Sequence, residues 1–362
     1  MIRLAEAVFD GHPDKFCDIL ADRLLGEAYR VDSGCYGQIE VAVWSDAVWF
    51  SGAVVTRQPF EIDLRRFVAQ VGKEIGYASS NAVDAEKYKV LNEACWITGD
   101  ATRWTRHVND QCVAIGWAGY DARTHYLPPE QFLAHALRNR MVKSFASGPL
   151  KGQGPDGKLL IRMREEGARW ILESVLVTIQ QKPEVSLLEV ASLVNLVLER
   201  AYEEIQGQDS RWVRNWKEVE LLANPNGALL NGGSDGDNGQ TGRKLVMDYY
   251  GPRVPLGGGA LSGKDFSHID RAAAYGARQA AITAVASGAS KCQVTLAYAP
   301  NRNAPMEVIY DLQGLGKVAR KERFCHDQLI GRYDAKSCIG RLGAGGHFFD
   351  LSLPWNQPDP SD

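Results

Sequence analysis

Apolar residues recur at intervals of three and four in several parts of the chain, and β-rich runs lie between those parts. The first helix is predicted to begin at Pro13, because proline suits the first helical position and Phe16 and Ile19 open an apolar stripe behind it. Residues 38–56 contain two β-rich runs, QIEVAVW and AVWFSGAVVT, and the polar pair between them predicts a hairpin. A second helix is predicted over residues 61–75.

The order helix, strand, strand, helix is predicted twice more along the chain. The second unit has a helix opened by Pro128 and Pro129, strands near 158–164 and 169–180, and a helix from about 186 to 205. The third unit has a helix near 268–287, the strands QVTLAYA and MEVIYDL, and a helix around 317–330. Three similar units more than 100 residues apart suggest an internal triplication.

This pattern predicts the α/β class, of the α+β type. We expect three similar domains of helices packed on mixed β-sheets, related by a pseudo-threefold internal repeat. The expected divisions are residues 1–100, 101–222 and 223–362, the last with the loops GDNGQTGRK and GGGALSGKD. Glycine-rich loops of this kind allow the backbone to approach a ligand closely.

Composition and charge narrow the class of protein. The chain of 362 residues is 45% hydrophobic, enough to bury a full core. A net charge of −3 gives no general basic field, so we expect neither nucleic acid nor a membrane as partner. The seven cysteines include no C-x-x-C pair and favour reduced thiols in a cytoplasmic protein. Charge precedes any long apolar run, so neither a signal peptide nor a membrane span is expected.

The segment GHPDK lies at the predicted start of the first helix. Free backbone N–H groups and the positive helix end favour an anion there, and His12 and Lys15 add donors. Asp14 would repel a bare phosphate but suits a phosphate that carries a divalent cation. A simple proline-initiated helix with Asp14 in its first turn explains the same residues equally well.

Two glycine-rich blocks add further cations. GGSDGDNGQTGRK places Arg243 beside Lys244, which suits phosphate oxygens, although a flexible loop with two surface cations is the simpler interpretation. GGGALSGKD contains Lys264, but Asp265 stands where a Walker A loop has Ser or Thr. Asp270 follows in the first turn of the next helix, where favourable interaction with the helix dipole is the alternative.

Glu40, Asp156 and Lys158 are weaker candidates. Glu40 alternates with apolar neighbours in a predicted strand, so a solvent-facing strand residue would explain it. Turn chemistry would explain Asp156 and Lys158 in their Gly/Pro loop. Taken together, three cation clusters at glycine-rich or helix-start positions, with paired carboxylates, indicate a polyphosphate and Mg²⁺ site without a P-loop.

Six blocks of sequence carry a resemblance to a known family. In chain order they are GHPDK, NDQ within HVNDQC (107–112), PDGK (155–158), NPNG (224–227), GDNGQTGRK (236–244) and GGGALSGKDFSHIDRAAAY (257–275). With these blocks the chain resembles S-adenosylmethionine synthetase, also called methionine adenosyltransferase. The resemblance spans most of the chain and weakens after residue 300.

The resemblance implies an activity and an assembly. The sulfur of methionine would attack C5′ of ATP, and the released tripolyphosphate would be hydrolysed to pyrophosphate and phosphate. The family also implies Mg²⁺ and K⁺ as cofactors. The assembly would be a homodimer with active sites at the subunit interface, or a tetramer.

The resemblance further implies roles for individual residues. Catalysis would fall to His12, Lys158, Arg243 and Lys264. The ATP-binding positions would be these four with Lys15, Asp110, Asp156, Asp237, Lys244 and Ala260. Asp14 and Asp270 would hold Mg²⁺, and Glu40 would hold K⁺. The acceptor pocket would comprise Ala53, Ile97, Asp237 and His268.

The acceptor pocket is where the chain departs from the family. Ala53 stands where the family has a glutamate that reads the methionine amino group, and His268 stands where a lysine is expected at the carboxylate. No glutamine occurs between Val90 and Asp110, where the family has one. We therefore expect the acceptor to be methionine or a related thioether or thiol. Two alternatives stay open: a non-catalytic ATP-binding partner that regulates a true synthetase, and a triphosphate-processing enzyme without alkyl transfer.

Overall fold

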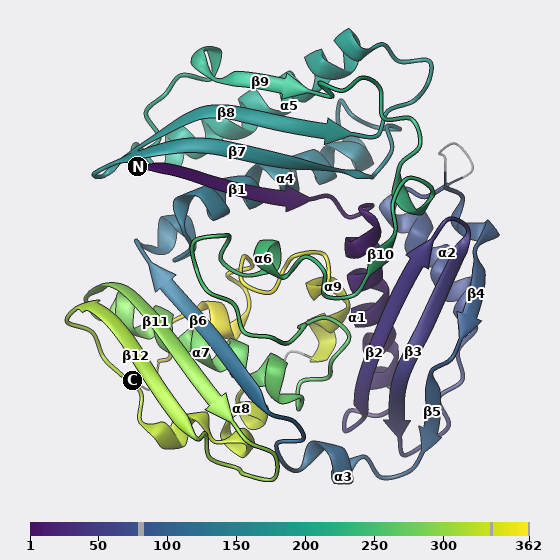
Figure 1. Ribbon diagram of the computed structural model, residues 1–362, viewed down its shortest axis with the longest axis vertical. Coiled ribbons are helices and arrows are strands. Elements are labelled where there is room, and N and C mark those ends of the chain that lie inside the picture. The colour runs from purple at the N-terminus through teal and green to yellow at the C-terminus, as the bar shows by residue number, and fades with distance from the viewer. Residues whose placement is uncertain (79–82, 334–335, 361–362) are drawn as a thin grey trace.

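The computed structural model describes residues 1–78, 83–333 and 336–360. In this part of the chain three β-sheets surround a central region, as Figure 1 shows, and helices pack against each sheet. The combination of helices with mixed sheets confirms the predicted fold class. Among the described residues, no helix has the length and apolar character that a membrane span requires.

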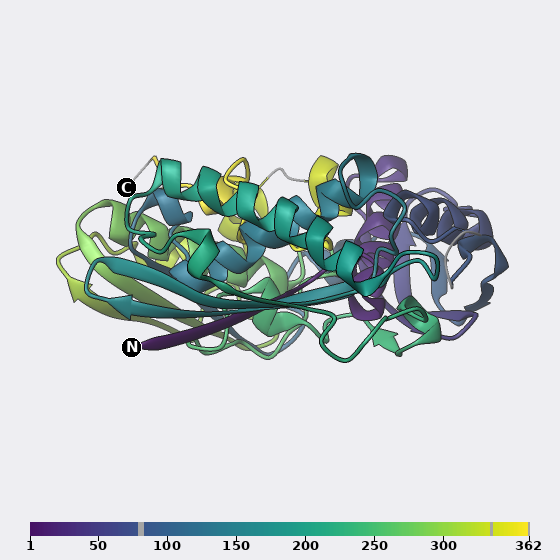
Figure 2. The same cartoon turned by 90° about the horizontal axis from the view of Figure 1, so that it is seen from above.

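The first sheet has the order β1-β7-β8-β9. Its strands are β1 (Ile2–Val8), β7 (Gly157–Glu166), β8 (Arg169–Ile179) and β9 (Glu220–Ala223). The helices α4 (Pro129–Ser147) and α5 (Leu187–Gln208) lie together over it (Figure 2). Ser186 caps α5 by accepting a hydrogen bond from the backbone N–H of Glu189. The predicted second unit is therefore confirmed in its helices and its hairpin.

The second sheet has the order β10-β2-β3-β4, with β5 also paired to β3. Its strands are β2 (Tyr36–Trp44), β3 (Ala47–Thr56), β4 (Lys89–Asn92), β5 (Cys95–Thr98) and β10 (Gly239–Gln240). The predicted hairpin turns at Ser45, which has a φ of 51°. The helices α1 (Pro13–Val31) and α2 (Leu64–Ile75) pack on it. Alternate residues of β2 are buried beneath α1, so the other set faces away from the core.

The third sheet is antiparallel and has the order β12-β11-β6. Its strands are β6 (Cys112–Gly119), β11 (Ala289–Tyr298) and β12 (Glu307–Gly314). The alanine-rich helix α7 (Ile269–Ala286) packs on β6 and β11, as predicted for a helix near 268–287. The short helices are α3 (Thr102–Thr105), α6 (Leu245–Asp248), α8 (His326–Arg332) and α9 (Ile339–Leu342).

Three strands cross the expected divisions of the chain. β1 pairs with β7, β6 pairs with β11, and β10 pairs with β2. Each sheet therefore combines two of the three expected segments. Short single strands find their partners through tertiary packing, which hydrophobic alternation does not specify. The division into three domains stays a prediction.

The helix predicted around 317–330 is wrong in its first part. A 3₁₀ turn occupies Lys321–Phe324, and α8 begins only at His326. The backbone N–H groups of Lys317 and Ala319 donate instead to the Ser287 and Tyr310 hydroxyls, at 2.8 and 3.1 Å. Arg320 and Cys325 have extended backbone, with ψ of 152° and 142°, so one continuous helix cannot pass through them.

The third sheet depends on close contact between β6 and α7 at Gly116. A Cβ atom at this position would lie 2.0 Å from the carbonyl carbon of Ala277, which is too close for any packed structure. We expect Gly116→Ala to lower the free energy of unfolding by about 2 kcal/mol or more, since backbone must move to admit the methyl group.

Denaturant unfolding of Gly116→Ala and Gly207→Ala would check this expectation. Gly207 lies in α5, and a Cβ there meets no atom within 4 Å. Gly207→Ala should therefore leave stability unchanged or raise it slightly. Equal stability of the two variants would show that β6 and α7 are not in close contact at Gly116.

Candidate active site

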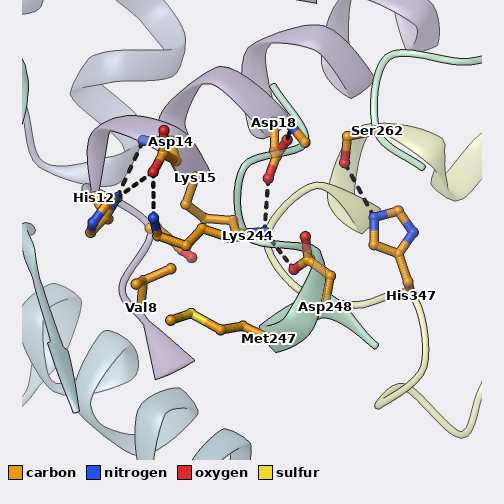
Figure 3. Close-up of polar contacts among 12 residues, drawn as sticks. Val8, His12, Asp14, Lys15, Asp18, Lys244, Met247, Asp248, Ser262 and His347 are labelled. Atoms are coloured by element: carbon orange, nitrogen blue, oxygen red, sulfur yellow. Dashed lines mark hydrogen bonds and ion pairs between the residues drawn. The ribbon is translucent and has the colours of Figure 1, made fainter. Parts of the chain in front are cut away.

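The N-terminus of α1 carries the first part of the site. His12 is the N-cap residue, and its Nδ1 accepts a hydrogen bond from the backbone N–H of Asp14 at 3.2 Å. The Asp14 carboxylate in turn receives Lys244 Nζ at 2.5 Å and the Gln240 backbone N–H at 2.9 Å, as Figure 3 shows for His12, Asp14 and Lys244. Arg243 Nη1 lies 3.4 Å from the same carboxylate. Residues more than 220 positions apart thus meet at the start of one helix.

His12 is held neutral in this cluster. Burial lowers its pKa to about 4, Lys244 and Lys158 add to the shift, and Asp14 and Asp237 oppose it. Because Nδ1 accepts from Asp14, the single proton of the neutral ring lies on Nε2. His12 therefore presents an Nε2–H donor among the predicted phosphate-binding residues.

Lys15 does not join this cluster. Its ammonium is 2% exposed and lies between the carboxylates of Asp18 at 2.9 Å and Asp248 at 2.5 Å (Figure 3). The ion pairs join α1 to α6, so the sequence prediction of Lys15 as an ATP ligand finds no support in its position. A buried lysine with two carboxylate partners serves the packing of the site.

The N-terminus of α7 repeats the arrangement at α1. His268 caps the helix, and its Nδ1 accepts from the backbone N–H of Asp270 at 3.3 Å. Lys264 Nζ lies 2.6 Å from the Asp270 carboxylate. The sequence therefore builds a capping histidine, a carboxylate two residues later and a lysine partner at both helix starts.

A cavity of about 430 Å³ opens beside Lys264 and Asp270. Its lining includes Glu40, Asp110 and Ala260, three positions that the sequence assigned to cation or ATP binding. It also includes residues of the loop 239–245 that links the two helix starts: Thr241, Gly242 and Leu245. The sequence could also be explained with Glu40 as a plain solvent-facing strand residue. In the structure Glu40 lines the cavity.

The two halves meet at Gly242. It has a φ of 79°, and a Cβ atom there would lie 2.6 Å from the Ala260 side chain. On the other side its backbone N–H donates to the Asp18 carboxylate at 2.8 Å. Only glycine combines this left-handed backbone with so close a contact. The loop therefore lies between α1 and the segment around Ala260 that precedes α7.

Comparison with known proteins supports the family resemblance that the sequence blocks carry. The models of the S-adenosylmethionine synthetase N-terminal and C-terminal domains match residues 1–95 and 231–337. S-adenosylmethionine synthase of Synechococcus elongatus is 31% identical over 99% of this chain and 95% of its own. S-adenosylmethionine synthase 1 of Rhodospirillum rubrum is 34% identical over 99% of this chain and 96% of its own. The chain belongs to the S-adenosylmethionine synthetase family.

A solved structure agrees with the shared fold. It is described as an unusual S-adenosylmethionine synthetase from Campylobacter jejuni, and it is 24% identical to this chain. The superposition has a TM-score of 0.84 and covers 99% of this chain and 97% of the other. The family resemblance that the sequence blocks carried is therefore confirmed.

Asp156 and Lys158, the family's PDGK residues, lie at the start of β7. Asp156 accepts a hydrogen bond from the backbone N–H of Gly233 at 2.6 Å. Its burial raises the pKa to about 6, against the opposing effect of the Gly233 and Gly157 backbone donors. Asp156 thus fixes the glycine-rich loop at 232–236, whereas exposed Lys158 lies close enough to His12 to affect its pKa.

The positions expected to form the acceptor pocket do not come together as one group. Ala53 on β3 and Ile97 on β5 share the open face of the second sheet. Asp237 lies near His12 and Asp156, whose pKa values it affects. His268 is 2% exposed at the start of α7, and burial with nearby Lys264 lowers its pKa.

Sequence reasoning missed two residues on this face, Tyr36 and Gln38. The hairpin pairs Tyr36 with Val55 and Gln38 with Ala53. A two-residue turn at Ser45 and Asp46 fixes this register, so the sequence contained the signal once the hairpin was predicted. Such cross-strand partners follow from the register of the hairpin and not from single positions.

The two predicted Mg²⁺ carboxylates fit a cation. Asp14 and Asp270 each hold a lysine ammonium at 2.5–2.6 Å, so both already bind positive charge at a helix start. Among the described residues, no group of three or more acidic, His or Cys side chains gathers for a metal ion. This donor set suits Mg²⁺, which proteins bind through one or two carboxylates with substrate phosphates. Glu40, the position predicted for K⁺, lies on the cavity wall with Asp110 and Asp270.

Proposed function

We propose that this chain is an ATP-dependent adenosyltransferase that alkylates a sulfur nucleophile. The observation that carries the proposal is the repeated histidine, carboxylate and lysine arrangement at the starts of α1 and α7, with the cations of residues 239–245 at the first of them. Two helix N-termini, paired cations and two carboxylates form the charge pattern that a metal-bound triphosphate requires. Family membership supports the same reaction class.

The reaction forms one bond and breaks another. A lone pair on the acceptor sulfur forms the S–C5′ bond, and the C5′–O5′ bond breaks with its electrons going to the departing tripolyphosphate. A thioether becomes a sulfonium and has no proton to lose, so no base is needed at sulfur. Water then hydrolyses tripolyphosphate to pyrophosphate and phosphate.

The chain's own residues would act on the leaving group. The Nε2–H of neutral His12 would donate to the oxygen that departs from C5′. Arg243, Lys244, Lys158 and Lys264 would neutralise the developing charge, since preorganised donors cost no reorganisation during reaction. Asp14 and Asp270 would hold Mg²⁺, which supplies further charge stabilisation when bound. Glu40 would contribute to a K⁺ site, and Asp110, Asp237 and Ala260 to the nucleotide site.

The proposed assembly is a homodimer with active sites at the interface. The open face of the second sheet exposes large apolar side chains at Trp44, Trp49, Leu91 and Ile97. A face of this kind is suited to a partner surface. A second copy of the chain placed there would close the side of the site that Ala53 and Ile97 leave open.

A triphosphate-processing enzyme without alkyl transfer is the second candidate. It is favoured by one observation: the carboxylate and lysine pairs at the two helix starts are formed, whereas the acceptor positions are scattered. A non-catalytic partner of a true synthetase would bind ATP and catalyse neither step. The three functions differ in what becomes of ATP.

The test is incubation with ATP, Mg²⁺, K⁺ and a panel of thioethers and thiols that includes methionine. We expect mass spectrometry to detect an adenosyl adduct with at least one acceptor, together with pyrophosphate and phosphate in equal amounts. Release of phosphate without any adduct would favour the triphosphate enzyme. ATP binding without either product would favour the regulatory partner.

A further inference from the structure

We infer that Gln38 determines acceptor specificity by donating a hydrogen bond on the sheet face beside Ala53, where the family resemblance implies an acidic residue. The inference rests on the proposed adenosyl transfer and names its acceptor class: a thioether that carries an oxygen, rather than an ammonium group, beside Ala53. It starts from strand register, since Gln38 pairs with Ala53 on one side and with Lys264 on the other.

Four side chains form a row across the second sheet. Gln38, Ala53 and Cys95 are successive partners on neighbouring strands (Figure 1 shows β2, β3 and β5 side by side), and Lys264 pairs with Gln38 through an isolated bridge. Directly paired residues project to the same face of a sheet, about 5 Å apart. Gln38 therefore lies one strand from Lys264, whose ammonium borders the cavity, and one strand from Ala53.

The amide of Gln38 is oriented by Tyr36. The Tyr36 hydroxyl donates to Gln38 Oε1 at 3.1 Å, and the Tyr36 ring stacks on Trp104 of α3 with centroids 5.9 Å apart. This contact uses the amide oxygen. Among the described residues the structure gives no hydrogen-bond partner to Gln38 Nε2, so the amide presents its N–H donors on the half-buried sheet face.

A donor at this place selects a different chemical group from an acid. A carboxylate accepts hydrogen bonds from an ammonium, whereas an amide N–H₂ repels an ammonium's hydrogens and donates to an oxygen. Ala53 leaves room next to Gln38 but offers no polar atom. The acceptor class that fits is a methylthio acid with a hydroxyl or carbonyl oxygen where methionine has its amino group.

Two carboxylates on the cavity wall could favour the opposite preference, for methionine. Glu40 and Asp110 line the cavity and could attract an ammonium group instead. If they do so, methionine is preferred and Gln38 is not its specificity residue. The two outcomes predict opposite orders of affinity for methionine and its 2-hydroxy analogue.

The experiment compares L-methionine with 2-hydroxy-4-(methylthio)butanoate in the wild type, Gln38→Leu and Gln38→Glu. Equilibrium binding is measured by calorimetry and adduct formation by mass spectrometry. We expect the wild type to bind the hydroxy acid more tightly, and Gln38→Leu to weaken that binding about tenfold with little change for methionine. Gln38→Glu should reverse the order, because its carboxylate accepts a charge-assisted hydrogen bond from an ammonium, which is stronger than the bond it accepts from a hydroxyl.

Gln293→Leu is the matched control, since Gln293 is a half-buried strand glutamine in the third sheet. It should bind both compounds as the wild type does. Preference for methionine in the wild type, or binding of the hydroxy acid that is unchanged in Gln38→Leu, would overturn the inference. Gln38-dependent binding without any adduct would leave the inference standing and reject the proposed adenosyl transfer.

Discussion

Replacing Lys264 by methionine should lower the rate of adenosyl transfer by about 100- to 1,000-fold. Its ammonium borders the cavity and lies 2.6 Å from the Asp270 carboxylate, where it is positioned by the bridge between its backbone and Gln38. Methionine keeps the length and apolar stem of the side chain but removes the charge. The lost interaction acts on charge that develops as triphosphate leaves, so kcat should fall more than the affinity for ATP.

The control is Lys291→Met, in which a lysine of β11 with no place in the proposed site is changed in the same way. Circular dichroism checks that both variants are folded at the assay temperature, since Lys264→Met leaves the largely buried Asp270 carboxylate without its lysine partner. Rates would be measured with the acceptor that proves productive. A Lys264→Met rate within threefold of the wild type would exclude Lys264 from the reaction.

Asp14→Asn and Asp270→Asn should each raise the Mg²⁺ concentration for half-maximal activity at least tenfold, and the double variant should be inactive. An amide preserves the shape of the side chain and removes the charge that attracts a hard divalent cation. The effect of Asp14→Asn should be the larger, since Asp14 is 0% exposed and also receives Gln240 N–H, Arg243 and Lys244.

Binding of Mn²⁺ in the presence of ATP, followed by electron paramagnetic resonance, provides a measurement that does not depend on turnover. Asp46→Asn is the control, because Asp46 lies in the exposed β2-β3 turn with Lys89 as its partner. If the Asp14 and Asp270 variants bind Mn²⁺ as the control does, the two acids serve only to stabilise the starts of α1 and α7.

The structure also changes how the acceptor pocket should be tested. Substitution of His268 by lysine would remove an N-cap whose Nδ1 accepts from Asp270, and would bury a second ammonium near Lys264. Loss of activity in such a variant would follow from damage to the metal side of the site. Gln38, on the open sheet face, can be changed without disturbing either helix start.

Local features explain which parts of the fold could be predicted. Pro13 opens α1, Ser186 caps α5, and the polar pair at residues 45–46 turns the first hairpin. In each case the information lies within a few residues of the element that it specifies. The helix around 317–330 failed because the backbone is extended at Arg320 and Cys325, which the apolar pattern of the segment does not indicate.

The sequence by itself determined the family and the two helix starts that carry Asp14 and Asp270, and it predicted the phosphate-binding blocks. Only the tertiary structure decided that Lys244 meets Asp14 across 230 positions, that Lys15 is buried in ion pairs, and that Gln38 lies between Ala53 and Lys264. Helix caps and hydrophobic periodicity depend on residues close together in the chain, so they can be predicted from the sequence. Pairing between distant segments depends on the packing of the whole molecule, and no local pattern contains it.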